Sequence, residues 1–380
     1  MHPSSPSSSE TDVSPPLDPQ RKNPAPKRPA LLATLVILAL GLAIFASLSV
    51  FWTPIQGAEI EDAGATASES SKTATPSPLP EPTTTPESTA TPAHDLVDTL
   101  TSTPTLTATI NHVVIISVDG LRPDALDQAH TPGLDGLRAS GAYCPSAKTV
   151  NISYTLPSHA SMLSGMIPEK HGIVWGLPFI GWPGMNGPTL FNVAHDANLD
   201  TGMVVGKEKL SYLVLPNSVD ELFCADAHDT EIKNQAVEFI RSGLPNVLFI
   251  HFPDTDRVGH AHGWMSDHQL QSVTFVDSLI GEIVAELERG GYLDSTLLII
   301  TADHGGHGDG HGDDSPLDRT IPWLAVGPGV PPGLILASDI DTFDTAATAA
   351  HALGLPCPEV WDGRPVFEIF EQMEITAEPN

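Results

Sequence analysis

The sequence predicts an α/β protein with a doubly wound, mainly parallel sheet flanked by helices, and two observations support this fold class. Four short runs are continuously apolar, as expected for parallel strands buried on both faces. They are HVVIISV (112–118), GMVVG (202–206), NVLFIHF (246–252) and TLLIITA (296–302). Segments with helical spacing follow or separate these runs. Strands that alternate with helices build a parallel sheet.

Helical spacing of apolar residues is found in three segments, 229–242, 266–289 and 343–353. The longest reads SDHQLQSVTFVDSLIGEIVAELER and is followed by Gly290 and Gly291, which are expected to end the helix. A further helix is expected to begin near Thr155, because Pro157 suits the first turn of a helix.

The N-terminal part predicts a membrane anchor. A Pro/Ser-rich tail (1–29), expected to be disordered and cytoplasmic, ends in basic residues and precedes an uncharged apolar run at 30–52. About 20 apolar residues suffice to cross a bilayer. The positive-inside rule then leaves everything after the run outside the cytoplasm. We expect a single-pass signal anchor in the cell membrane. A cleaved signal peptide is the alternative, although the run is longer than a usual signal-peptide core.

Composition divides the rest of the chain. Residues 53–109 are rich in Ser, Thr and Pro, which predicts a disordered linker. A globular domain is expected at 110–372, followed by a short tail at 373–380. With 17 Lys and Arg against 47 Asp and Glu, the net charge of −30 argues against a nucleic-acid-binding surface. Three cysteines are too few for a disulfide-built scaffold.

Potential metal ligands follow three of the four predicted strands. Asp119 follows the first, a Pro-Asp-Thr-Asp segment and His260 follow the third, and an Asp-His-rich loop follows the fourth. Sites in open α/β sheets lie beyond the carboxyl ends of strands. One Asp there is commonly an Asx turn or a helix cap, but three such clusters favour a metal centre. Carboxylates and imidazoles are ligands that Zn²⁺ uses.

The segment SYTLPSHASMLSG (153–165) offers a nucleophile. Thr155 is expected at the N-terminus of a helix, where backbone N–H groups and the helix dipole favour a bound phosphate. Taken alone, Thr155 or Ser158 could equally be a plain helix cap.

The order of these motifs resembles the alkaline phosphatase superfamily, and within it the type I phosphodiesterase/nucleotide pyrophosphatase family. The motifs are Asp119-Gly120, the segment TLPSH from Thr155, Asp256-x-x-Gly-His260, Asp303-His304-Gly and His311-Gly. The resemblance covers essentially the whole globular domain and implies an alkaline phosphatase-like fold. It implies that Asp119, Asp303 and His304 hold one divalent cation together with Thr155, and that Asp256, His260 and His311 hold a second. Zn²⁺ is the expected metal and Mn²⁺ the alternative.

By the same resemblance, Thr155 attacks phosphorus and forms a covalent intermediate that water hydrolyses. Such a chain would act on a small phosphate ester or nucleotide. The sequence departs from the family pattern at one position. Related phosphodiesterases carry an Asn after His-Gly-Ile-Val, and this Asn helps to hold a phosphoryl oxygen. Here HGIV (171–174) is followed by Trp175 and Gly176. Lys207, Lys209 or a backbone N–H are the candidate replacements, and Trp175 is a further candidate for substrate contact.

The remaining imidazoles and carboxylates are weaker candidates. His159 is expected to orient the nucleophile loop or to pack beneath it. Asp254, His262 and His307 are expected around the metal centre rather than on it.

Three alternatives remain. A phosphomonoesterase of the same superfamily would use the same residues. A sulfatase is disfavoured, because Thr155 cannot become formylglycine and no Cys/Ser-x-Pro-x-Arg segment occurs at that position. A catalytically inactive, metal-binding ectodomain is the alternative from a different class, and the intact ligand set argues against it.

Overall fold

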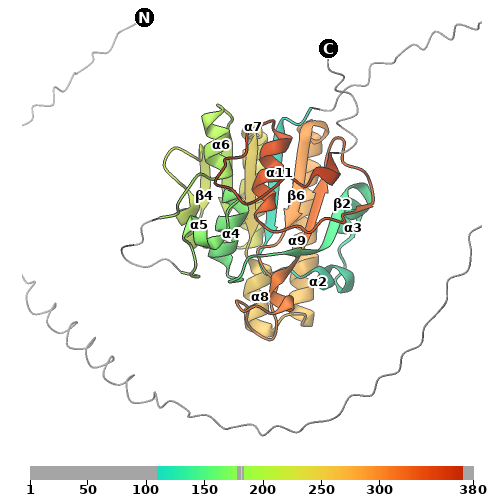
Figure 1. Cartoon of the computed structure of the whole chain (residues 1–380). Coiled ribbons are helices and arrows are strands. Elements are labelled where there is room, and N and C mark those ends of the chain that lie inside the picture. Colours follow the sequence, from blue (N-terminus) through green and yellow to red (C-terminus); the bar gives the residue numbers. More distant parts are fainter. Residues whose placement is uncertain (1–108, 178–180, 182–183, 371–380) are drawn as a thin grey trace, which may run out of the picture. The chain divides into compact units, whose positions relative to one another are not determined.

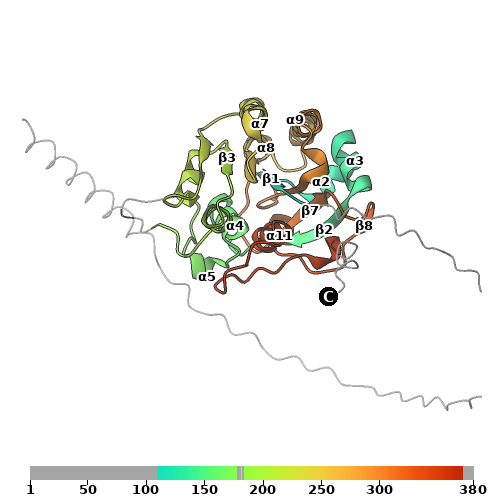
Figure 2. The same ribbon diagram turned by 90° about the horizontal axis from the view of Figure 1, so that it is seen from above.

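The computed structural model describes residues 109–177, 181 and 184–370, which build an eight-stranded sheet with helices on both faces (Figure 1; Figure 2). The strand order is β4-β3-β5-β1-β6-β7-β2-β8. The strands are β1 (His112–Val118), β2 (Ala142–Lys148), β3 (Thr201–Val205), β4 (Glu221–Cys224), β5 (Val247–Phe252), β6 (Thr296–Thr301), β7 (Thr320–Val326) and β8 (Leu334–Ile335).

The sheet is mixed, with one reversed strand. The strands from β4 through β6 run parallel to one another, β7 runs antiparallel to both of its neighbours, and β8 pairs parallel with β2. The three central strands, β5, β1 and β6, are buried along almost their whole length. This burial explains why their sequences are apolar without alternation.

Helices cover both faces of the sheet. They are α2 (Pro123–Gln128), α3 (Pro132–Ser140), α4 (Thr155–Ser164), α5 (Pro168–His171), α6 (Leu190–Asp196), α7 (Asp229–Gly243), α8 (Asp254–His262), α9 (Asp267–Arg289), α10 (Pro316–Arg319) and α11 (Asp344–Ala352). Figure 2 shows α3, α7 and α9 on one side of the sheet and α4 and α11 on the other. The fold is therefore a three-layer α/β sandwich, as its sequence pattern predicts.

The predicted elements are confirmed, and four strands are additional. Each predicted strand agrees with β1, β3, β5 or β6 to within one residue, and the predicted helices correspond to α7, α9, α11 and α4. Four further strands, β2, β4, β7 and β8, had no strand signal in the sequence. Pro145 interrupts β2 and Pro322 interrupts β7, and proline argues against a strand. The other two strands, β4 and β8, are too short to show the alternation of apolar and polar residues that is typical of a strand.

The predicted anchor at 30–52, the predicted tail at 1–29 and most of the predicted linker lie outside the described residues, as do 373–380. No helix in the described part of the chain has the length and apolar character that crossing a membrane requires. The three thiols, Cys144, Cys224 and Cys357, form no disulfide.

Candidate metal centre and nucleophile

Adjacent strands bring the predicted ligands to one edge of the sheet. Asp119 directly follows β1, and Asp303 and His304 follow its neighbour β6. On the other side of β1, strand β5 leads into α8, which carries Asp256 and His260 on one face because they are four residues apart. The parallel order β5-β1-β6 thus gathers residues that are far apart in the chain.

The first group consists of Asp119, Asp303 and His304, all with side chains that are fully buried. Their ligand atoms lie within 4.8 Å of one another. His304 Nε2 is 3.4 Å from Asp119 Oδ1 and 3.2 Å from Asp303 Oδ2.

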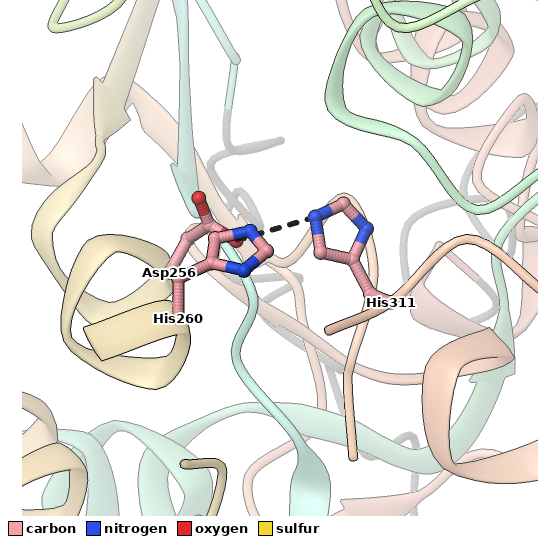
Figure 3. Close-up of side chains that lie close together, drawn as sticks. All are labelled: Asp256, His260 and His311. Carbon is pink, nitrogen blue, oxygen red and sulfur yellow. Dashed lines mark ion pairs between the residues drawn. The ribbon is translucent and has the colours of Figure 1, made fainter. Parts of the chain in front are cut away.

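The second group consists of Asp256, His260 and His311, which face one another in Figure 3. His260 Nε2 lies 3.4 Å and His311 Nε2 lies 3.5 Å from the same carboxylate oxygen, Asp256 Oδ1. This group is more open than the first, because 46% of the His260 side chain is exposed. The structure therefore brings together the Asp and His residues that the sequence predicted for each site.

Backbone carbonyls fix the tautomers of the three imidazoles. In each ring, Nδ1 lies 2.8 Å from a backbone carbonyl oxygen. The carbonyl belongs to Asp309 for His260, to Gly305 for His304 and to Ser153 for His311. A carbonyl oxygen only accepts, so each Nδ1 carries the proton and each Nε2 presents a lone pair. Burial lowers the pKa of His304, and burial and His304 lower the pKa of His311 to about 4. These two rings are therefore neutral, ligand-ready imidazoles at pH 7.

Three buried carboxylate oxygens support the presence of cations. Asp119 Oδ1, Asp256 Oδ1 and Asp303 Oδ2 have no hydrogen-bond partner among the described residues. Each faces one or two of the imidazole lone pairs described above. A buried, unpaired carboxylate oxygen beside a lone pair is costly unless a cation lies between them. The residues present therefore fit two divalent cations, each held by oxygen and nitrogen ligands.

Thr155 lies at the metal centre as the first residue of α4. Its side chain is buried, and its Oγ1 is 3.4 Å from His304 Nε2 and 3.5 Å from Lys207 Nζ. The helix ends at Gly165, which has φ +63°, and a Cβ there would lie 2.6 Å from the Trp361 ring. Glycine thus allows α4 to end in the left-handed conformation beside the Trp361 ring.

A buried hydrogen-bond network lies beneath the nucleophile. The Nδ1–H of His159 donates to the carbonyl of Thr155 at 2.7 Å, and its Nε2 accepts from the hydroxyl of Ser117 at 2.9 Å. The sequence prediction that His159 orients the nucleophile loop is consistent with these contacts. The His251 ring packs edge-on against His159, with centroids 4.9 Å apart.

His251 holds the ligand Asp119. The N–H of Gly206 donates to its Nδ1 at 3.4 Å, so Nε2 carries the proton and donates to Asp119 Oδ2 at 2.8 Å. This contact leaves the other oxygen of Asp119 free for a cation. Sequence reasoning missed His251, although a signal existed. Ser117 and His251 are paired in register and are polar residues within apolar strands.

Replacing His251 with leucine is expected to weaken binding of the first cation by about 10- to 100-fold, because partners of metal ligands contribute about that much to affinity. His251→Gln, which keeps a donor, should recover part of the loss. Calorimetric titration of chelator-stripped protein with Zn²⁺ measures both. His171→Leu is the matched control, since His171 is equally buried but bonds only Ser161 and Ile173. Equal losses in the two leucine variants would contradict the role of His251.

Lys207 bridges the two groups. Its Nζ lies 2.7 Å from Asp119 Oδ2 and 2.6 Å from Asp256 Oδ2. Burial opposes ionisation of Asp119, but Lys207, with His251 and His304, holds the pKa of Asp119 well below its usual value. Burial and the charge of Asp119 raise the pKa of Asp303 well above its usual value.

Of the other candidates for substrate contact, Lys209 lines a hollow together with Lys207. Trp175 is partly buried in the loop after α5. Its neighbour Gly176 lies against Tyr154, the residue before the nucleophile.

The remaining Asp and His residues lie outside the two groups. Asp254 pairs with His228 and Arg257. His262 stacks on His268. His307 belongs to a third group with Asp313 and the buried Asp318. Asp318 accepts hydrogen bonds from His307 Nδ1 at 2.6 Å and from the backbone of Gly312 at 2.8 Å and Asp313 at 3.2 Å, so it shapes the loop that carries His311.

The three-layer α/β fold, with two Asp/His groups and a threonine at its strand ends, is an alkaline phosphatase-like fold. The family model "Type I phosphodiesterase / nucleotide pyrophosphatase" matches residues 113–175 and 204–314. Over these two stretches the chain is similar to the type I phosphodiesterase/nucleotide pyrophosphatase family.

Two curated relatives illustrate the similarity. A bis(5'-adenosyl)-triphosphatase of Mus musculus is 25% identical over 212 residues, which are 51% of this chain and 46% of that protein. An uncharacterised pyrophosphatase/phosphodiesterase of Schizosaccharomyces pombe is 27% identical over 215 residues, 51% of this chain and 44% of that protein. The chain thus spans about half the length of the curated relatives it matches.

Solved structures show the same fold. Murine ectonucleotide pyrophosphatase/phosphodiesterase 5, inactive and in complex with AMP, has a TM-score of 0.60 at 15% identity, covering 69% of this chain and 99% of that one. A phosphonate monoester hydrolase from Silicibacter pomeroyi has a TM-score of 0.56 at 16% identity, covering 68% and 76% of the two chains.

Proposed function

We propose that this chain is a membrane-anchored phosphoric ester hydrolase that uses Thr155 as nucleophile and two divalent cations, Zn²⁺ or Mn²⁺. One observation carries the proposal: the hydroxyl of Thr155 lies beside His304, where the two Asp/His groups meet. The phosphodiesterase and pyrophosphatase activities named for its relatives give the reaction class.

The side chains divide into three tasks. One cation would be held by Asp119, Asp303 and His304 with Thr155, and the other by Asp256, His260 and His311. Bound cations supply positive charge that favours ionisation of the Thr155 hydroxyl and neutralises phosphoryl oxygens. His159 fixes the backbone of Thr155, and the N-terminus of α4 directs its dipole toward the developing negative charge.

The reaction then follows from the position of Thr155. Its Oγ1 attacks phosphorus, a new O–P bond forms, and the bond to the leaving oxygen breaks, which gives a phosphothreonine or nucleotidyl-threonine enzyme. Water next attacks the same phosphorus and releases the Thr155 hydroxyl.

The apolar run at 30–52, with basic residues before it, supports a single-pass anchor that places the domain outside the cytoplasm. The Ser/Thr/Pro-rich segment 53–109 would serve as a spacer between membrane and domain.

The test is metal-dependent ester hydrolysis. The full chain in detergent is stripped with a chelator and restored with Zn²⁺ or Mn²⁺. It is then assayed on bis-p-nitrophenyl phosphate, p-nitrophenyl phosphate and the p-nitrophenyl ester of thymidine monophosphate. We expect turnover that disappears on stripping and returns with metal. A folded protein that binds two cations per chain but hydrolyses none of the esters would instead be a metal-binding ectodomain.

A further inference from the structure

A hollow of about 450 Å³ lies beside Lys207. It is lined by Leu177, Lys207, Glu208, Lys209, Asp226 and Arg257. Its connection to the centre is Lys207, whose Nζ lies 3.5 Å from Thr155 Oγ1. A substrate whose phosphorus is at Thr155 therefore lies close to a hollow with cations in its wall.

Two of the three cations in the wall are already engaged by the protein. Lys207 is bonded to Asp119 and Asp256. Arg257 donates to the carbonyls of Ala227 and Gly206 and pairs with Asp254.

Lys209 is different. Its side chain has no hydrogen bond or ion pair with any other residue in 109–177, 181 and 184–370. It is partly buried, and burial and the neighbouring Lys207 lower its pKa. An ammonium group that is partly removed from water and has no partner favours an incoming anion. The acidic residues of the wall, Glu208 and Asp226, are exposed, so solvent screens their charges.

We propose that Lys209 selects substrates that carry a second negative charge at or next to the reacting phosphorus. This inference rests on the proposed function and narrows its substrate class. A simple diester has one negative charge, shared by the two oxygens that face the cations. A monoester near neutral pH has about two. An anhydride carries its additional charge on the neighbouring phosphate.

The glycine at position 176 supports the role proposed for Lys209. Related phosphodiesterases have an uncharged Asn side chain at this place in the motif, and here no side chain exists to donate. The loop that contains Gly176 continues to Leu177 in the wall of the same hollow. The donors around the substrate thus shift from a neutral amide toward a cation, which favours the more highly charged ester.

The experiment compares Lys209→Met with the full-length wild-type enzyme, metal-loaded, on three kinds of substrate. p-Nitrophenyl phosphate has its second charge on the reacting phosphoryl group, ATP has it on neighbouring phosphates, and bis-p-nitrophenyl phosphate has none. In Lys209→Met, we expect kcat/KM for p-nitrophenyl phosphate or for ATP to fall by about 10- to 100-fold. The kcat/KM for bis-p-nitrophenyl phosphate should change by less than about threefold. The substrate whose kcat/KM falls shows whether Lys209 recognises a charge on the reacting phosphoryl group or on a neighbouring phosphate. Lys209→Arg should retain most of the activity.

A binding measurement gives a readout that does not depend on turnover. In a Thr155→Ala background, inorganic phosphate and AMP are titrated calorimetrically with and without Lys209→Met, and we expect about tenfold weaker binding of both in the double variant. Lys233→Met is the control, because Lys233 is also a partly buried lysine but is paired with Glu282 at 2.8 Å. Equal losses on all three substrates, or unchanged anion binding, would overturn the role of Lys209. Absence of turnover on every substrate by the wild type would instead refute the proposed function.

Discussion

Thr155→Ala is expected to reduce hydrolysis of every ester by about 10³- to 10⁶-fold, the range found when a nucleophile is removed. In the proposed reaction, Oγ1 of Thr155 forms the bond to phosphorus, and no other hydroxyl is placed beside His304 in the described part of the chain. The change removes the nucleophile but leaves six Asp and His ligands intact. Steady-state kinetics on the chromogenic esters, with metal content measured in parallel, tests the prediction.

The control is Thr348→Ala, which makes the same chemical change in a buried threonine of α11 whose hydroxyl bonds Asp344 and Val366. It should leave kcat within about threefold of the wild type, because it touches neither Asp/His group. Thr155→Ser keeps a hydroxyl and should retain measurable turnover. If Thr155→Ala kept both its metal and more than a tenth of the activity, another group would be the nucleophile.

Much of the two Asp/His groups could be predicted from sequence, because Asp119 and Asp303 come just after strands that are apolar and uninterrupted. To place Asp119 and Asp303, it is enough to know where β1 and β6 end, and the sequence defines these ends to within one residue. Parallel pairing then places those ends side by side. Gly120 is part of the same signal. Its φ of +74° and the contact that a Cβ would make with Asp256, at 3.1 Å, show why glycine follows the first ligand.

Contacts that depend on register and on side-chain reach could not be predicted in the same way. Lys207 was a candidate for substrate contact, yet its ammonium lies between Asp119 and Asp256. Only the three-dimensional position of β3 relative to β5 reveals this. His251 is similar, because its bond to Asp119 follows from the pairing of β1 with β5. Strands such as β7 were not predicted, because a proline within the segment argues against a strand.

Gly176→Asn is expected to raise kcat/KM for diesters, by up to about 10²- to 10³-fold, since removal of one donor to a developing negative charge costs about that much. The position has room for a Cβ. A Cβ at Gly176 would lie 3.6 Å or more from Tyr154, its closest neighbour, which is ordinary van der Waals contact. Gly176 is also not among the glycines with positive φ, so the change introduces no backbone strain.

The size of the gain should depend on the substrate. An Asn amide donates without adding charge, so it should help the monoanionic bis-p-nitrophenyl phosphate more than the dianionic p-nitrophenyl phosphate. The ratio of the two kcat/KM values should therefore move toward the diester. Gly136→Asn is the matched control, because Gly136 lies in α3 with nothing near its Cβ position and should leave both rates unchanged. A Gly176→Asn enzyme that binds its metals but gains nothing on either ester would mean that Lys209 or a backbone N–H already supplies the missing donor.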